Sequence, residues 1–169
     1  MDSTTTNDTL QRERTSKIVM ELLWWLVTAV IAWMVTGPYW KHFANDEYVI
    51  ELLIFVVALL TIARYLFLLK YTFLARFQLL KFILIFASIP LAFWGIQEFF
   101  DFREFYETQS EGMVIGQSYF APGLGFSERY QVLQRFLPIY SFFASSAILT
   151  PIVMPFRLLV SYWRVYNNT

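Results

Sequence analysis

Four long apolar stretches constrain this chain more than any other feature of its sequence; they cover residues 18–39, 48–69, 82–99 and 136–160. Each is close to the roughly 20 residues that a helix needs to cross the hydrocarbon core of a bilayer, which is about 30 Å thick. The stretches therefore predict an all-α integral membrane protein. We expect a four-helix bundle with a partly structured outer loop, residues 100–135, between the third and fourth spans.

The rest of the chain divides simply. Residues 1–16 are polar and lack apolar periodicity, so we expect a disordered cytoplasmic N-terminus. Residues 17–163 are predicted to form the transmembrane domain, and residues 164–169 a cytoplasmic tail. Within the outer loop, Phe99–Tyr106 is predicted to extend the third span as a helix. A separate short helix, Glu128–Phe136, is predicted to end before Pro138.

The chemistry available to the chain is narrow. Only 15% of its 169 residues are charged, whereas soluble domains carry about 25%. The absence of cysteine excludes disulfides, thiol chemistry and cysteine-ligated metals. The lone histidine, His42, could share a metal with Asp46 only on a helix, which Gly37 and Pro38 disfavour, so we interpret it as a surface residue. Nucleotide-binding, serine-hydrolase and zinc-protease motifs are missing from the sequence. We therefore predict no catalytic residue, metal, cofactor or nucleic-acid partner.

The distribution of charged residues among the loops predicts the orientation of the chain in the membrane. Nine basic residues lie in or beside the N-terminal segment, the link between spans two and three, and the C-terminal end of span four with its tail: Arg12, Arg14, Lys17, Arg64, Lys70, Arg76, Lys81, Arg157 and Arg164. The two other loops hold four basic residues and nine acids. Loops rich in Lys and Arg stay cytoplasmic, so both termini are predicted inside. This is the pattern of a multi-pass protein of the plasma (inner) membrane, if the source is bacterial.

Two charges lie inside the predicted spans. Glu21 is four residues beyond Lys17, and Arg64 is six residues before Lys70, so both sit roughly 6–9 Å inside the cytoplasmic edge. Similar depth favours a Glu21–Arg64 ion pair, because intramembrane charges are costly without partners. The alternative is that each side chain reaches separately to the interface.

Small and hydroxyl residues recur at helical spacing along the spans. Such residues let membrane helices approach closely, so we predict that they face the bundle interior. The alternative is a polar path for a substrate along the same faces. The predicted packing residues are Thr28, Ala32, Ala58, Ser88, Ala92, Ser141 and Ser145.

Two connecting segments suggest contacts outside the bundle. The link 64–81 is basic and aromatic, which suits anionic lipid of the cytoplasmic leaflet or, more plainly, ordinary anchoring. The outer loop 100–135 is too apolar for simple disorder, and we expect a folded cap or a partner-docking surface.

Spans two and three resemble the second and third helices of voltage-sensor domains. The shared features are Arg64-Tyr65, Phe73 or Phe77 in the link, and Ser88-Ile89-Pro90. The resemblance implies a voltage-sensor-like four-helix fold. The chain departs from that family where Leu60 and Leu84 replace its acids, and where span four lacks an arginine series, so gating charge is missing.

These features lead to one functional expectation with two alternatives. We expect a non-catalytic accessory or structural subunit of a larger membrane complex, with other membrane subunits or further copies of the chain as partners. The first alternative is a small transporter or channel-type module. The second is a lipid-modifying enzyme that uses Glu21 and Arg64 near the headgroups.

Overall fold

Four α-helices make up nearly all of the described chain. The computed structural model describes residues 3–44, 46–68, 78–111 and 120–167. Its helices are α1 (Ser3–Thr36), α2 (Glu47–Leu68), α3 (Gln78–Glu111) and α4 (Phe126–Asn167), and these residues contain no β-strand. The predicted all-helical fold is therefore confirmed.

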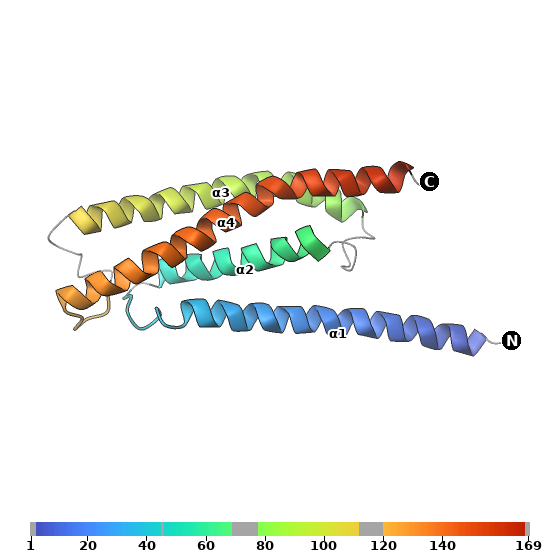
Figure 1. The fold of residues 1–169 in the computed structure, drawn as a ribbon, viewed down its shortest axis with the longest axis horizontal. Helices are drawn as coiled ribbons and strands as arrows, with labels where there is room; N and C mark the ends of the chain where they lie inside the picture. The colour runs from blue at the N-terminus through green and yellow to red at the C-terminus, as the bar shows by residue number, and fades with distance from the viewer. Residues whose placement is uncertain (1–2, 45, 69–77, 112–119, 168–169) are drawn as a thin grey trace.

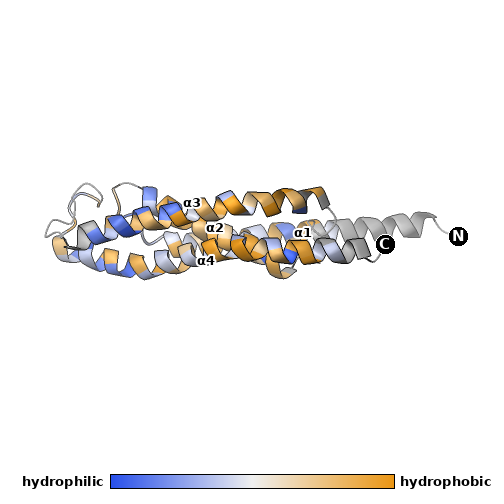
Figure 2. Ribbon diagram, turned by 90° about the horizontal axis from the view of Figure 1, so that it is seen from above, coloured by the Kyte–Doolittle hydropathy of each residue, from blue (hydrophilic) through white to orange (hydrophobic). Residues whose placement is uncertain are grey.

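Each helix contains a segment long and apolar enough to cross a membrane. The segments are Ile18–Thr36, Glu47–Phe67, Lys81–Glu107 and Phe126–Ser161. Figure 2 shows hydrophobic residues along the middle of the helices, with hydrophilic residues gathered near one end of α3 and α4. Length and composition thus fit a multi-pass membrane protein.

The helices run back and forth along one axis. The N- and C-terminal ends lie at the same end of the bundle, which we call the terminal end (Figure 1). The opposite end holds residues 37–44 and 120–125, and we call it the loop end. Helix α4 packs against both α2 and α3, while α1 packs closely only against α2. The bundle is therefore open on the α1 side.

The main core lies toward the loop end and is rich in aromatic rings. Tyr140, Phe136, Phe102 and Phe55 are almost completely buried there. The rings of Tyr140 and Phe102 stack with their centroids 3.8 Å apart. Large rings bury the most area per residue and prefer such offset contacts, so this cluster fixes α4 against α2 and α3. A smaller apolar cluster toward the terminal end contains Ile62, Met154 and Leu158.

The beginning of the chain differs from the expectation. Residues 3–16 were expected to be disordered, but they form the first turns of α1. Once the apolar part of a helix is anchored, each further residue adds a hydrogen bond without a new nucleation cost. Residues 11–14 are Gln, Arg, Glu and Arg, all good helix formers. Helix propagation therefore extends α1 through the polar N-terminal residues.

Helix α1 ends three residues before the boundary expected at position 39. The Gly37 N–H still bonds the Trp33 carbonyl at 2.7 Å, and turns closed by Tyr39 and His42 follow. Pro38 disfavours a helical conformation at Gly37 and has no N–H of its own, so the helix stops there.

Helix α4 is continuous where two helices were expected. The separate helix 128–136 does not exist; α4 runs through Pro138, Pro151 and Pro155 and reaches Asn167, past the boundary of the expected tail. Each proline removes the donor for the carbonyl four residues earlier. Thr150 Oγ1 donates to the Ala147 carbonyl at 3.2 Å, which is the carbonyl that Pro151 leaves without its donor. Hydroxyl groups commonly repair membrane helices in this way.

Helix α3 confirms the predicted extension, because it continues from the third span to Glu111. The described end of the outer loop packs on the turn after α1: Phe120 is buried and bridges to Phe43, and the Ala121 N–H donates to the His42 carbonyl at 3.0 Å. The remainder of that loop, residues 112–119, lies outside the described residues. So do residues 69–77 of the basic link, with Phe73 and Phe77.

Candidate functional site

An ion pair joins α1 and α2 toward the terminal end. The Arg64 Nη2 donates to Glu21 Oε2. The Arg64 side chain is only 8% exposed, whereas the Glu21 side chain is 34% exposed. The structure therefore brings together the two charges that the sequence places at similar depth.

Two aromatic rings complete the surroundings of the guanidinium. Arg64 Cζ lies 5.6 Å from the ring centroid of Trp24 and 5.8 Å from that of Tyr65. A cation over a ring face gains about 0.5–2 kcal/mol, more when it is desolvated. Trp24 Nε1 is buried and has no hydrogen-bond partner within the described part of the chain. Arg64 is thus held by one carboxylate and two rings from α1 and α2.

A second polar contact lies toward the loop end. The hydroxyl of Tyr140, a fully buried residue, donates to Glu51 Oε2 at 2.7 Å. The Glu98 carboxylate of α3 lies close enough to Glu51 to interact with it electrostatically. Three helices therefore contribute to this contact. Sequence reasoning did not find it, because Tyr140 and Glu51 lie 89 positions apart. The available signal was that Phe136, Tyr140 and Ala144 recur on one helical face.

A lysine is buried between α3 and α4. Lys81 is 1% exposed, and its Nζ donates to Ser161 Oγ at 3.2 Å. No salt bridge joins it to a carboxylate in residues 3–44, 46–68, 78–111 or 120–167. Lys81 is among the basic residues predicted to be cytoplasmic, and no sequence pattern indicates that its side chain is buried.

The loop end carries a mixed pocket of about 360 Å³, lined in part by Tyr39, His42, Glu128 and Arg135. The Tyr39 hydroxyl donates to the Arg135 carbonyl oxygen at 3.4 Å. Burial raises the pKa of Tyr39, and the Arg135 guanidinium opposes this rise, so the phenol stays protonated and can donate. His42 Nδ1 lies 2.8 Å from the Pro38 carbonyl oxygen. Among the residues that the structure describes, no three metal-ligating side chains converge.

The predicted packing residues divide into two groups. Thr28, Ala32, Ser88 and Ala92 are buried between helices. Ala58 and Ser141 are half-buried, and Ser145 is exposed. For Ser145 the expectation is wrong, since α4 turns a neighbouring face inward.

That inward face of α4 carries Tyr140, Ala144 and Ala147, all buried. The large ring buries much apolar area, and the two small alanines allow α4 to approach its neighbours closely.

Apolar side chains separate the two polar contacts. Glu51 and Arg64 stand 13 residues apart on α2, which corresponds to about 20 Å. Phe55, Val56 and Ala144 are buried between them. Within the described residues, polar side chains therefore do not form a continuous line through the bundle. These contacts join α1 to α2 and α2 to α4.

Comparison of the chain with protein-family models, with curated proteins and with solved structures gave no match. The likeness of spans two and three to voltage-sensor domains therefore stays an expectation from sequence.

Proposed function

We propose that this protein is a non-catalytic accessory subunit of a larger membrane complex, with both termini in the cytoplasm. The observation that carries the proposal is the position of α1. This helix packs closely only against α2, through Thr28, Ala32 and Thr36. Its other faces are apolar and open: Trp33 is 70% exposed and Met34 is 71% exposed.

An outer helix with open faces suits assembly with a second chain. Membrane helices associate through van der Waals packing and interhelical hydrogen bonds, with small residues at close contacts. On α1, the small residues Thr28, Ala32 and Thr36 are buried on the face toward α2. The remaining large side chains of α1, including Trp33, form an exposed apolar surface on which a partner helix can pack. The apolar side chains that fill the space between α2 and α4 support a structural role.

The direct test is native mass spectrometry of the assembly after gentle extraction from its own membrane in mild detergent. We expect the chain at the mass of a complex that contains at least one other subunit. A species that contains this chain alone, as a monomer or as a homo-oligomer, would contradict the proposal.

A variant pair locates the docking surface. Trp33→Ala with Met34→Ala removes two exposed side chains from α1 and should reduce co-purification of the partner. The matched control is Phe86→Ala, which removes an exposed aromatic side chain (58% exposed) from α3. Equal loss of the partner in the control would show that α1 is not the docking surface.

The proposed orientation has its own test, because the chain has no native cysteine. A single cysteine at Pro122, at the loop end, should react with a membrane-impermeant maleimide in intact cells. A cysteine at Ser16 should react only after permeabilisation. The reverse pattern would invert the orientation.

A second candidate function is a small transporter or channel-type module. The observation that favours it is the contact of Glu51, Tyr140 and Glu98 inside the spanning segments, since intramembrane ionisable groups often mark ion or proton paths. The apolar block at Phe55 and Val56 opposes it. Ion or proton flux through vesicles that contain the purified chain alone, abolished by Glu51→Gln, would favour this alternative over the accessory role.

A further inference from the structure

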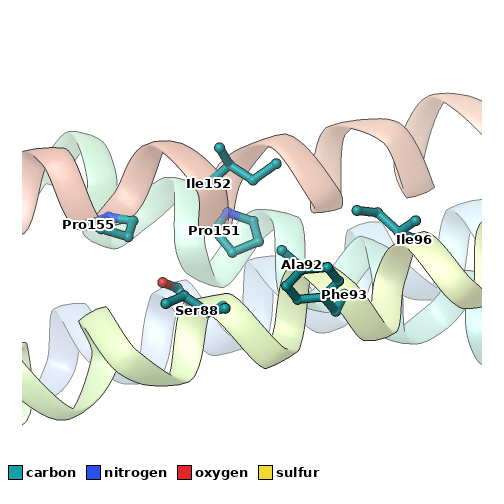
Figure 3. Close-up of a pocket in the computed structure, with 8 residues that line it drawn as sticks. Ser88, Ala92, Phe93, Ile96, Pro151, Ile152 and Pro155 are labelled. Atoms are coloured by element: carbon teal, nitrogen blue, oxygen red, sulfur yellow. The ribbon is translucent and has the colours of Figure 1, made fainter.

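An apolar groove runs along the seam between α3 and α4 (Figure 3). It encloses about 250 Å³ and is lined by Ser88, Ala92 and Ile96 of α3, with Pro151 and Pro155 among the residues of α4. Figure 3 shows the two proline rings on the side of α4 that faces Ser88 and Ala92. Small side chains on one helix opposite compact rings on the other leave the seam unfilled.

Close contacts between the two helices limit the groove. Beside its loop-end part, a Cβ on Gly95 would lie 3.1 Å from Ile148 Cγ1, so the helices already touch there. Toward the terminal end, Lys81 Nζ reaches Ser161 Oγ at 3.2 Å. The groove is therefore a gap of defined length within a packed helix pair, and not a general separation of α3 from α4.

The lining has no free hydrogen-bond donor on its side chains. Ser88 is the one polar residue among those that line the groove, and its hydroxyl donates to the Ile85 carbonyl at 2.7 Å. An ion or a polar solute would lose its hydration without gaining partners, at a cost of several kcal/mol. The occupant must therefore be apolar.

The groove opens on the outside of the bundle. Three of its lining residues are substantially exposed: Ile89 at 53%, Phe93 at 69% and Ile152 at 46%. Pro151 lies ten residues, about 15 Å, from Ser161 at the end of the spanning segment of α4. The residues that line the groove all lie inside the segments of α3 and α4 that are long and apolar enough to span a membrane, so in a bilayer the opening faces lipid tails.

The dimensions distinguish the two apolar occupants that a membrane offers. From Ser88 to Ile96 the helix rises about 12 Å, so the groove is elongated along the axis of α3. A single hydrocarbon chain, with carbon atoms in contact at about 4 Å, suits such an elongated apolar groove. A partner helix, about 10–12 Å wide with its side chains, does not fit.

We propose that this groove binds one acyl chain of a bilayer phospholipid as a site of defined position. The chain fills the gap that Ser88 and Ala92 leave opposite the two prolines, and so completes the packing of α3 against α4. The groove lies on α3 and α4, away from the open faces of α1, so it does not depend on the proposed subunit role.

The test uses phosphatidylcholine that carries a diazirine in its acyl chain, mixed into phosphatidylcholine vesicles that contain the full chain. After illumination, peptide mass spectrometry maps the adducts. We expect adducts to concentrate on residues 88–96 and 151–155, above the level at the exposed Phe86 and Trp33. Labelling of the groove no higher than at those two positions would overturn the proposal.

Substitutions that fill the groove test whether the adducts depend on it. Ile152→Trp adds bulk at the rim from a half-exposed position, and Ser88→Leu fills the groove from the other helix; either should abolish the groove adducts. The control, Leu149→Trp, lies on exposed α4 surface outside the groove (60% exposed) and should leave them unchanged. Persistence of the adducts in a folded Ile152→Trp or Ser88→Leu protein would refute the site.

A second copy of the chain is the remaining rival occupant. In the cysteine-free background, Phe93→Cys places a thiol at the exposed rim of the groove. Efficient disulfide-linked dimers at this position would overturn the lipid assignment, and monomers only would support it.

Discussion

The ion pair between Glu21 and Arg64 allows the most demanding test of this fold. The perturbation is a double-mutant cycle of Glu21→Gln, Arg64→Met and the two together. If the pair acts as a unit, the combined change in the free energy of unfolding will be smaller than the sum of the single changes.

The magnitude follows from the exposure of the two side chains. Removing one member of a buried pair costs about 3–5 kcal/mol, whereas a fully exposed pair contributes about 0–1 kcal/mol. Arg64 is 8% exposed but Glu21 is 34% exposed, so the carboxylate is partly screened. We therefore expect Glu21→Gln to cost about 2 kcal/mol, because it leaves a nearly desolvated guanidinium with only its two rings. The coupling energy should be about 1–2 kcal/mol.

The assay is reversible unfolding of the purified protein in bicelles, followed by tryptophan fluorescence. The chain supplies its own control in Arg103 and Glu107, which form a pair on α3 with side chains 62% and 55% exposed. The same cycle on that pair should give a coupling of at most about 0.5 kcal/mol. Additive effects at Glu21 and Arg64, or a coupling no larger than that of the control pair, would refute the reasoning.

Two further predictions concern the interior contacts. Tyr140→Phe keeps the buried ring but removes the donor to Glu51, and should lower the free energy of unfolding by about 1–2 kcal/mol in the same assay; an unchanged value would mean that water replaces the hydroxyl without loss. Lys81→Met keeps the length of an enclosed side chain and removes a desolvated charge, so it should be neutral or stabilising by about 1 kcal/mol. A clear loss of stability would show that the ammonium has a counter-charge.

Sequence patterns predicted the features that depend on local chemistry. The number of helices long enough to span a membrane and the extension of the third span follow from apolar length and the absence of turn residues, and both agree with the structure. The predicted helix end before Pro138 was wrong, because the local sequence pattern could not show that α4 continues on both sides of Pro138 as one long, packed helix. A membrane helix tolerates proline when side chains satisfy the freed carbonyls, as Thr150 does for Ala147.

The polar contacts between the helices were harder to predict from the sequence than the helices themselves. Similar depth in the membrane was enough to suggest the pairing of Glu21 with Arg64, because depth can be counted along each helix. The rotation of each helix about its own axis, and the helices that become its neighbours, cannot be worked out from positions along the sequence. Tyr140 and Glu51 meet only because α4 turns that face toward α2, and Ser145 remains outside for the same reason.

By itself, the sequence determined that the chain forms four helices long and apolar enough to cross a membrane, because hydrophobicity and helix length are local properties. Only the tertiary structure decided that α4 packs between α2 and α3, that α1 has one close neighbour, and that an apolar groove opens opposite Pro151 and Pro155. The physical reason is that lipid covers any apolar face equally well. Within a membrane, hydrophobicity therefore does not choose neighbours, and the fit of side chains between helices does.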